Sequence, residues 1–159
     1  MRAEPMQSAR IAGFTYLSLL ILIAILSMVA VATLQLGAAV QRDEAERQLL
    51  ATGAEFRAAF ASYAAATPAG QPGTPQSLAD LLRDPRYPEP RHYLRKLYAD
   101  PLTGKPEWGT VPAPDGRGIV GVYSLAPGHP LKIARFDEPF HSFEAKTAYG
   151  DWVFSILVR

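Results

Sequence analysis

Three histidines are the side chains of this sequence most suited to catalysis or metal binding: His92, His129 and His141. They lie too far apart to match the short spacing with which two histidines on one helix bind a metal. The serines occur in no Gly-x-Ser-x-Gly string, and the glycines form no phosphate-binding loop. We therefore expect no enzymatic activity and no catalytic or metal-binding residues, with each histidine on the surface or in a loop.

Charge and cysteine content narrow the classes of partner. The 159-residue chain has no cysteine, which excludes disulfides, zinc–thiolate sites and thiol chemistry. Its 16 basic and 15 acidic residues leave a net charge of +1, so no basic excess attracts nucleic acid, and we expect no nucleic-acid partner. Asp84 and Asp100 each precede a proline, a pattern typical of turns rather than of catalytic acids.

The most informative feature is a run without charge near the N-terminus. Residues 11–41 carry no charged side chain, and residues 14–36 are almost wholly apolar. About 20 such residues span a bilayer as a helix, whereas a cleaved secretory signal has an apolar region of only about 7–15 residues. A core helix of a soluble protein normally shows a polar face, which this run lacks. The sequence therefore predicts a transmembrane helix.

The residues before this run predict its orientation. Arg2 and Arg10 outweigh Glu4, so the positive-inside rule places the N-terminus in the cytoplasm. The C-terminal part then lies on the outer side of the membrane.

The residues from Arg10 to Leu17, with the order Arg-Ile-Ala-Gly-Phe-Thr-Tyr-Leu, resemble the prepilin signal of type IV pilins and type II secretion pseudopilins. The resemblance implies that a prepilin peptidase cuts between Gly13 and Phe14 and that the new N-terminal Phe14 is methylated. Because the cut lies before the apolar run, the mature protein keeps its membrane helix. The mature chain would carry equal numbers of acidic and basic residues.

One position departs from the family pattern. The fifth mature residue is usually glutamate, whose carboxylate pairs in the membrane with the N-terminal amine of a neighbouring subunit, but here it is Ser18. Two interpretations stay open: a minor subunit, for example at the filament tip, or a variant that polymerises through packing alone.

The helix is predicted to continue beyond the membrane to about residue 66, with Gly37 as its weakest helix former. Apolar residues recur on one helical face, which predicts packing against a small sheet. These residues are Leu49, Phe56, Phe60 and Tyr63.

The rest of the chain shows signals of short elements. A proline- and glycine-rich connection over residues 67–75 precedes a short helix, with Thr74 as its cap and Pro75 at its first position. Residues 91–98 are predicted as a second short helical or extended piece with a solvated basic face. A hairpin turn is expected at Asp115-Gly116. The predicted strands are residues 108–111, 119–124, 131–136 and 152–158.

This order of elements, and the stretch Tyr93-Leu94-Arg95 followed by Asp100-Pro101 and Gly104, also resemble general secretion pseudopilins. The resemblance implies an α+β, pilin-like fold: a long N-terminal helix, transmembrane in its first half, packed on a small antiparallel β-sheet. The corresponding parts are a leader (1–13), a transmembrane half-helix (14–41), a periplasmic half-helix (42–66) and a globular head (67–159). Major pseudopilins hold calcium near the sheet, so calcium is the one ion to consider. The acids of the C-terminal loops match no ligand pattern: Asp137, Glu138, Glu144 and Asp151.

The resemblance implies a structural function. The chain would be a subunit, and a minor one, of a type II secretion pseudopilus: a single-pass inner-membrane protein with its head in the periplasm. Its partners would be the prepilin peptidase, other pseudopilins or pilins, the inner-membrane assembly platform and membrane lipid. Two alternatives stay open. One is a minor type IV pilin for adhesion, motility or DNA uptake, and the other is a binding domain on an uncleaved membrane anchor.

Overall fold

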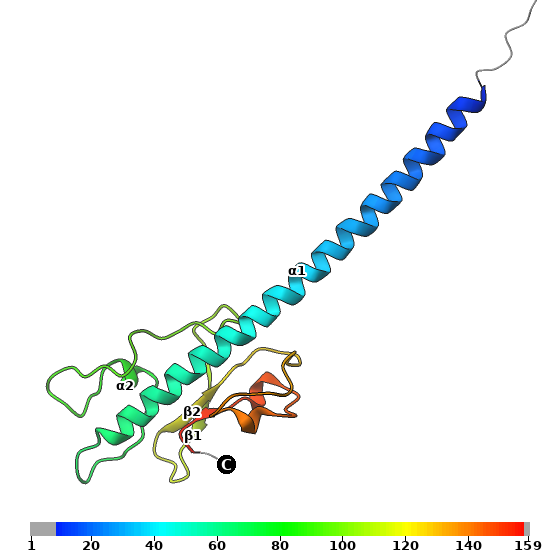
Figure 1. The fold of residues 1–159 in the computed structure, drawn as a ribbon. Coiled ribbons are helices and arrows are strands. Elements are labelled where there is room, and N and C mark those ends of the chain that lie inside the picture. The colour runs from blue at the N-terminus through cyan, green and yellow to red at the C-terminus, as the bar shows by residue number, and fades with distance from the viewer. Residues whose placement is uncertain (1–8, 158–159) are drawn as a thin grey trace, which may run out of the picture. The chain divides into compact units, whose positions relative to one another are not determined.

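The structure is a computed structural model that describes the backbone of residues 9–157 and the side chains of residues 15–30 and 37–157. It is an α+β protein in which helices combine with a three-stranded antiparallel sheet (Figure 1). The chain divides into two compact units, Met1–Gln41 and Arg42–Arg159. The sheet and the core belong to the second unit.

The first element is the long helix α1, Ala9–Ala65, of 57 residues. Its sequence is dominated by alanine and leucine, which favour helix, and contains no proline. The predicted C-terminal end near residue 66 is confirmed, and Gly37 does not interrupt the helix. The helix begins before the predicted start at Phe14.

The second unit packs the last part of α1 against a small sheet (Figure 1). The predicted apolar face is confirmed, because all four of its members are buried in the core: Leu49, Phe56, Phe60 and Tyr63. The sheet has the strand order β1-β2-β3, with β1 Gly109–Pro112, β2 Ile119–Tyr123 and β3 Phe154–Ser155. Each neighbouring pair is antiparallel, with Gly109 opposite Tyr123 and Val122 opposite Phe154.

The hairpin predicted at Asp115-Gly116 is confirmed. It joins β1 to β2, and Gly116 adopts a positive φ of 70°, which glycine accepts without steric cost. The Arg117 backbone N–H donates to the Asp115 carboxylate at 3.0 Å and closes the turn.

A cluster of aromatic rings completes the core. Phe143 stacks on Trp152 with ring centroids 5.7 Å apart, and Phe154 meets Phe143 edge to face at 5.2 Å. Two 3-10 turns carry members of this cluster: η1, His141–Phe143, and η2, Tyr149–Asp151. Aromatic contacts therefore organise a C-terminal segment that has little regular structure.

The predicted strand over residues 131–136 is wrong, because these residues form no strand. The backbone N–H groups of Leu131 and Lys132 donate to the side chain of Glu46 rather than to a neighbouring strand. Of the strand predicted over residues 152–158, residue 158 lies outside the described residues, and residues 152–157 form only the two-residue strand β3.

Two further details of the prediction are wrong. The short helix α2, Ala79–Leu82, is not capped by Thr74, whose hydroxyl donates to the Arg117 carbonyl. The Asp80 carboxylate instead accepts the N–H groups that precede the helix. Residues 91–98 form neither helix nor strand, although their basic side chains are exposed as expected.

Candidate functional site

The residues predicted to direct processing lie on one helix. Gly13, Phe14 and Ser18 all belong to α1, and Ser18 follows Phe14 by one helical turn. The side chain of Ser18 is exposed, and that of Phe14 lies outside the side chains that the structure describes. The first eight residues of the predicted leader lie outside the residues that the structure describes.

The surface of α1 that follows Gly13 and Phe14 is apolar and exposed. Each of its large apolar side chains between residues 16 and 29 is at least 46% exposed, and Met28 reaches 79%. These side chains are Tyr16, Leu17, Leu19, Leu20, Ile21, Leu22, Ile23, Ile25, Leu26, Met28 and Val29. A large aliphatic side chain gains about 1.5–3 kcal/mol when it is buried, so a continuous surface of this kind marks an interaction site.

Among the segments whose side chains the structure describes, no helix has both the length and the apolar content needed to cross a membrane.

Glu46 forms the first of three buried polar clusters in the second unit. Its carboxylate lies on α1 and is only 2% exposed. It accepts the Tyr149 hydroxyl at 2.6 Å and the backbone N–H groups of Leu131 and Lys132 at 2.6 and 3.0 Å. Three donors compensate a buried carboxylate for the loss of water. Glu46 therefore fixes a C-terminal loop to the helix.

Arg42 extends the Glu46 cluster by one turn of α1. Its guanidinium donates to the Tyr149 hydroxyl at 3.1 Å and to the His129 carbonyl at 2.6 Å. Burial, followed by the hydrogen bond to Glu46, raises the pKa of Tyr149, and the hydrogen bond to Tyr149 raises the pKa of Arg42. Both shifts move the pKa further from neutral pH, so Tyr149 stays neutral and Arg42 stays charged, as suits a structural anchor.

Asp84 and Arg86 form the second cluster, at the C-terminal end of α1. Their side chains are 0% and 6% exposed and pair at 2.7 Å. Arg86 also donates to the Tyr63 carbonyl at 2.9 Å and to the Thr67 hydroxyl at 2.8 Å, and its guanidinium lies 3.5 Å from the centre of the Tyr63 ring. Hydrogen bonds from Arg86 lower the pKa of Asp84. Arg86 thus satisfies a carbonyl that the end of the helix leaves unpaired.

Asp100 is the third buried acid and holds a turn. Its carboxylate accepts the Ser124 hydroxyl at 2.7 Å and the Leu102 N–H at 2.9 Å. Asp84 likewise accepts the N–H of Arg86, two residues further on, at 2.9 Å. The prediction that both acids serve turns is confirmed.

The histidines lie where the sequence predicts, in exposed positions. His92 and His129 contact backbone carbonyls, those of Leu82 and Thr147. His141 lies 3.4 Å from the Glu138 carboxylate and 4.0 Å from that of Glu144. The spacing of three residues on each side signals these contacts, which the sequence analysis missed.

The described residues contain no group of three side chains that could hold a metal ion. The four acids considered for calcium are exposed and are not gathered into a site: Asp137, Glu138, Glu144 and Asp151. No calcium ligands are therefore assigned.

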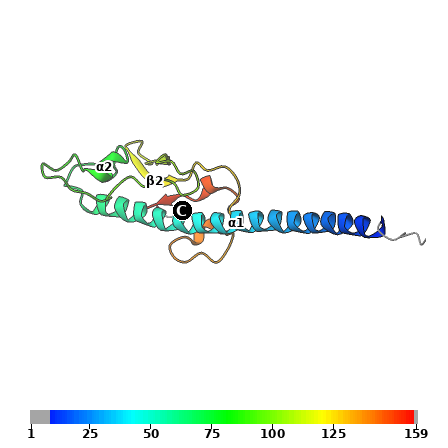
Figure 2. The ribbon, with the colours of Figure 1, turned by 90° about the horizontal axis from the view of Figure 1, so that it is seen from above.

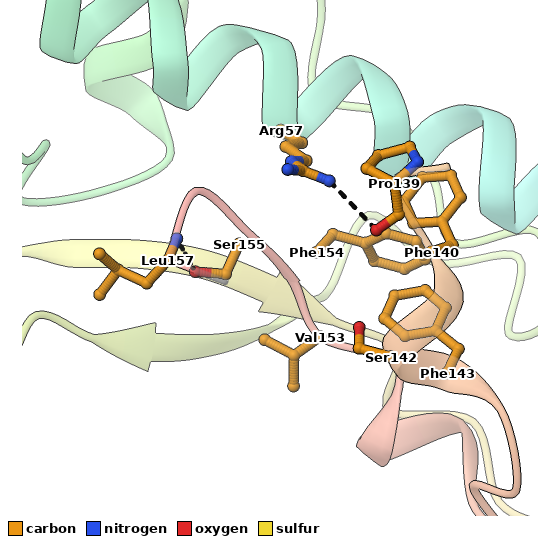
Figure 3. Close-up of a pocket in the computed structure, with 9 residues that line it drawn as sticks. All are labelled: Arg57, Pro139, Phe140, Ser142, Phe143, Val153, Phe154, Ser155 and Leu157. Carbon is orange, nitrogen blue, oxygen red and sulfur yellow. Dashed lines mark hydrogen bonds between the residues drawn. The ribbon is translucent and has the colours of Figure 1, made fainter. Parts of the chain in front are cut away.

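A small pocket lies between α1 and the C-terminal segment (Figure 3). The Arg57 side chain reaches across it and donates to the Pro139 carbonyl at 3.3 Å. Its volume of about 40 Å³ suits about one water molecule. Phe140, Phe143 and Phe154 line it, so it carries no set of groups suited to acid–base or nucleophilic chemistry.

A larger groove of about 530 Å³ lies over the sheet on the side of Val120 and Ser155. Its lining is mainly aliphatic, with Lys146 and Asp151 as its charged members. Ser142 and Ser155 also line it, but no histidine stands among the lining residues to activate their hydroxyls, so the groove does not define an active site.

Comparison of the chain with protein-family models, with curated proteins and with solved structures finds no match. The residues of the chain itself therefore carry the functional proposal.

Proposed function

We propose that this chain is a structural subunit, and a minor one, of a type II secretion pseudopilus. The observation that carries the proposal is the sequence around Gly13 and Phe14, which is followed directly by an exposed apolar helix surface. A processing site at this position keeps that surface on the mature protein. The surface is then available for the membrane before assembly and for neighbouring helices afterwards.

The second unit supports a structural role for the head. Its three buried acids accept hydrogen bonds that hold loops and turns together, which is the work of structural anchors. The last part of α1 packs on a three-stranded antiparallel sheet, an arrangement consistent with a pilin-like fold. We propose that the unit acts as the outward-facing head of a filament subunit.

The proposed sequence of events follows from these parts. The precursor is held in the inner membrane by the apolar part of α1, with its N-terminus in the cytoplasm and its head in the periplasm. A prepilin peptidase cuts after Gly13, and the new N-terminal Phe14 is methylated. The inner-membrane assembly platform then moves the subunit into the filament, where apolar helices replace lipid as its surroundings.

Intact-mass analysis of the protein from membranes, with and without an active prepilin peptidase, tests this proposal. We expect a chain that begins at N-methylated Phe14 only when the peptidase is present. Gly13→Ile should block the cut, because a peptidase site built around glycine has no room for a branched side chain. Gly37→Ile is the matched control: it changes another glycine of α1 that has no atom within 4 Å of an added Cβ, and processing should continue.

A chain that keeps residues 1–13 in both samples would contradict the proposal and would leave an uncleaved anchor. Normal processing of Gly13→Ile would also contradict the assignment of the cleavage site.

A further inference from the structure

We infer that the loop formed by residues 128–135 is a second membrane contact of this protein: it lies in the headgroup layer of an anionic lipid surface, with two aliphatic side chains directed into the lipid. This inference rests on the proposed function, because it requires that the apolar part of α1 lies in a membrane. It adds a lipid-binding surface on the head, away from the processing site.

The loop is fixed to the first charged turn that follows the charge-free run of α1. Arg42 is the first charged residue after the charge-free run, and its guanidinium holds the His129 carbonyl at 2.6 Å. One turn later, Glu46 accepts the N–H groups of Leu131 and Lys132. Figure 2 shows the segment after β2 reaching α1 in this region. The backbone of the loop is therefore held rigidly beside the point at which the chain enters the second unit.

The loop presents aliphatic side chains to the outside. Leu131 is 50% exposed and Ile133 is 63% exposed, although the backbone beside them is anchored. Ile133 also borders a hollow of about 310 Å³, whose wall is largely apolar and includes Pro130 and Ala145. An anchored backbone with exposed aliphatic tips resembles the way in which peripheral proteins insert side chains into the headgroup and acyl boundary.

The charge of the loop complements anionic lipid. Residues 128–135 contain Lys132 and Arg135 and no acid, and Arg42 lies beside them. Lys132 places its ammonium 4.9 Å from the centre of the Phe136 ring, which leaves its charge in place. The acids around the loop are Glu46, which is buried and satisfied, Glu144, which accepts the backbone N–H of Arg135, and the exposed Asp137 and Glu138, which follow the loop in the chain. The solvent-facing charges of the loop itself are positive.

The position of Glu46, which holds the loop, agrees along the chain with the depth of the headgroup layer. The charge-free run ends at Gln41, and α1 rises about 1.5 Å per residue, so Glu46 lies only about 7–8 Å further along the helix. The headgroup layer on each side of the hydrocarbon is about 5–8 Å thick.

Three single-cysteine variants of the full chain test the inference, because the protein has no other cysteine. Ile133→Cys reports on the loop, Leu22→Cys on the apolar part of α1, and Gln71→Cys on an exposed position beyond the other end of α1. Each is labelled with an environment-sensitive fluorophore and reconstituted into vesicles of equal parts phosphatidylcholine and phosphatidylglycerol. Quenching by a nitroxide placed near the glycerol end of the lipid acyl chains is compared with quenching by iodide in solution.

We expect lipid quenching at Leu22 and Ile133 and iodide quenching at Gln71. The double variant Lys132→Gln/Arg135→Gln should lower the ratio of lipid-facing to water-facing probe at Ile133, by about fivefold for each cation removed. Vesicles of phosphatidylcholine alone should lower this ratio in the same direction.

The possible outcomes distinguish the lipid contact of the loop from the membrane anchor of the proposed function. Lipid quenching at Leu22, with Ile133 as open to iodide as Gln71, would overturn the lipid contact and leave the membrane anchor in place. Absence of lipid quenching at Leu22 would overturn the anchor of the proposed function and this inference with it. If protection of the label at position 133 from iodide depends on the amount of protein per vesicle rather than on lipid, the loop contacts another copy of the chain. That result would overturn the inference.

Discussion

Asp84 shows how much of the head depends on one buried ion pair. Its side chain has no exposed surface, and its oxygens are occupied by Arg86 and by the Tyr93 hydroxyl at 2.9 Å. Arg86 in turn holds the end of α1 through the Tyr63 carbonyl. Removing one member of a buried pair leaves the other charge without compensation, at a cost of about 3–5 kcal/mol.

The first prediction concerns the pH dependence that Asp84 gives to folding. Arg86 lowers the pKa of this carboxyl below its ordinary value of 3.8. A carboxyl with a lowered folded pKa stabilises the protein above its unfolded pKa, and this contribution disappears as the pH falls through the folded pKa. The wild-type protein should therefore lose stability below about pH 5, and Asp84→Asn should be less stable at pH 7 and change less between pH 5 and pH 2. Urea unfolding in detergent micelles, followed by tryptophan fluorescence, measures both effects.

Asp137→Asn is the matched control for this prediction. Asp137 is an exposed acid, so its substitution should leave the stability and the pH profile close to those of the wild type. Parallel pH profiles for Asp84→Asn and the wild type would contradict the role assigned to the ion pair.

At the scale of elements, the contact between α1 and β3 depends on a glycine. Gly53 is buried on α1, and a Cβ at this position would lie 2.1 Å from the ring of Phe154. The ring itself is packed among Phe140 and Phe143, so it cannot move away freely. Glycine therefore permits the close approach of the sheet to the helix, although it is a weak helix former.

The second prediction compares two glycines of the same helix. Gly53→Ala should destabilise the head by about 1–3 kcal/mol through overpacking, even though alanine favours helix by about 1 kcal/mol. Gly37→Ala, which adds its Cβ in open space, should leave the head unchanged. Thermal unfolding of the two variants in micelles measures the contrast. Phe154→Leu in the Gly53→Ala background should recover part of the loss, and equal stability of Gly53→Ala and Gly37→Ala would contradict the close packing.

The sequence predicted correctly those elements that depend on residues close together in the chain. The helix to about residue 66, its buried face and the hairpin at Asp115-Gly116 follow from spacing and turn chemistry, and all three are confirmed. The strand predicted at residues 131–136 is wrong because its hydrogen-bond partner is Glu46, which lies far away in the sequence. The sequence near residue 131 holds no sign of that partner.

The candidate site shows the same limit. The motif around Gly13 and Phe14 is contiguous, so the sequence alone identifies it as a candidate. The anchor of Glu46, Arg42 and Tyr149 joins residues more than a hundred positions apart, and only the fold brings them together. The lipid-contacting surface inferred for residues 128–135 depends on that anchor and could not be predicted from spacing.

At the scale of the whole molecule, the third prediction concerns how the mature chain would assemble. Ser18 lies one helical turn after Phe14 on α1, at the position where the resembling family carries glutamate. A carboxylate within a membrane requires a partner, and the N-terminal amine of a neighbouring mature chain would supply one. Ser18→Glu should therefore increase lateral incorporation into filaments, and filament counts together with cysteine crosslinking between subunits measure it.

Ser27→Glu provides the matched control, because Ser27 lies on the same apolar segment but further from Phe14, the proposed N-terminus of the mature chain. Its hydroxyl donates to the Ile23 carbonyl at 2.8 Å, so the substitution also removes a local hydrogen bond. A carboxylate here would find no amine at its depth, and we expect fewer filaments than with the wild type. A gain that is specific to Ser18→Glu would indicate that the missing carboxylate restricts this subunit to a minor or terminal place. Identical filament counts and crosslinks for Ser18→Glu and the wild type would instead favour a subunit that assembles through helix packing alone.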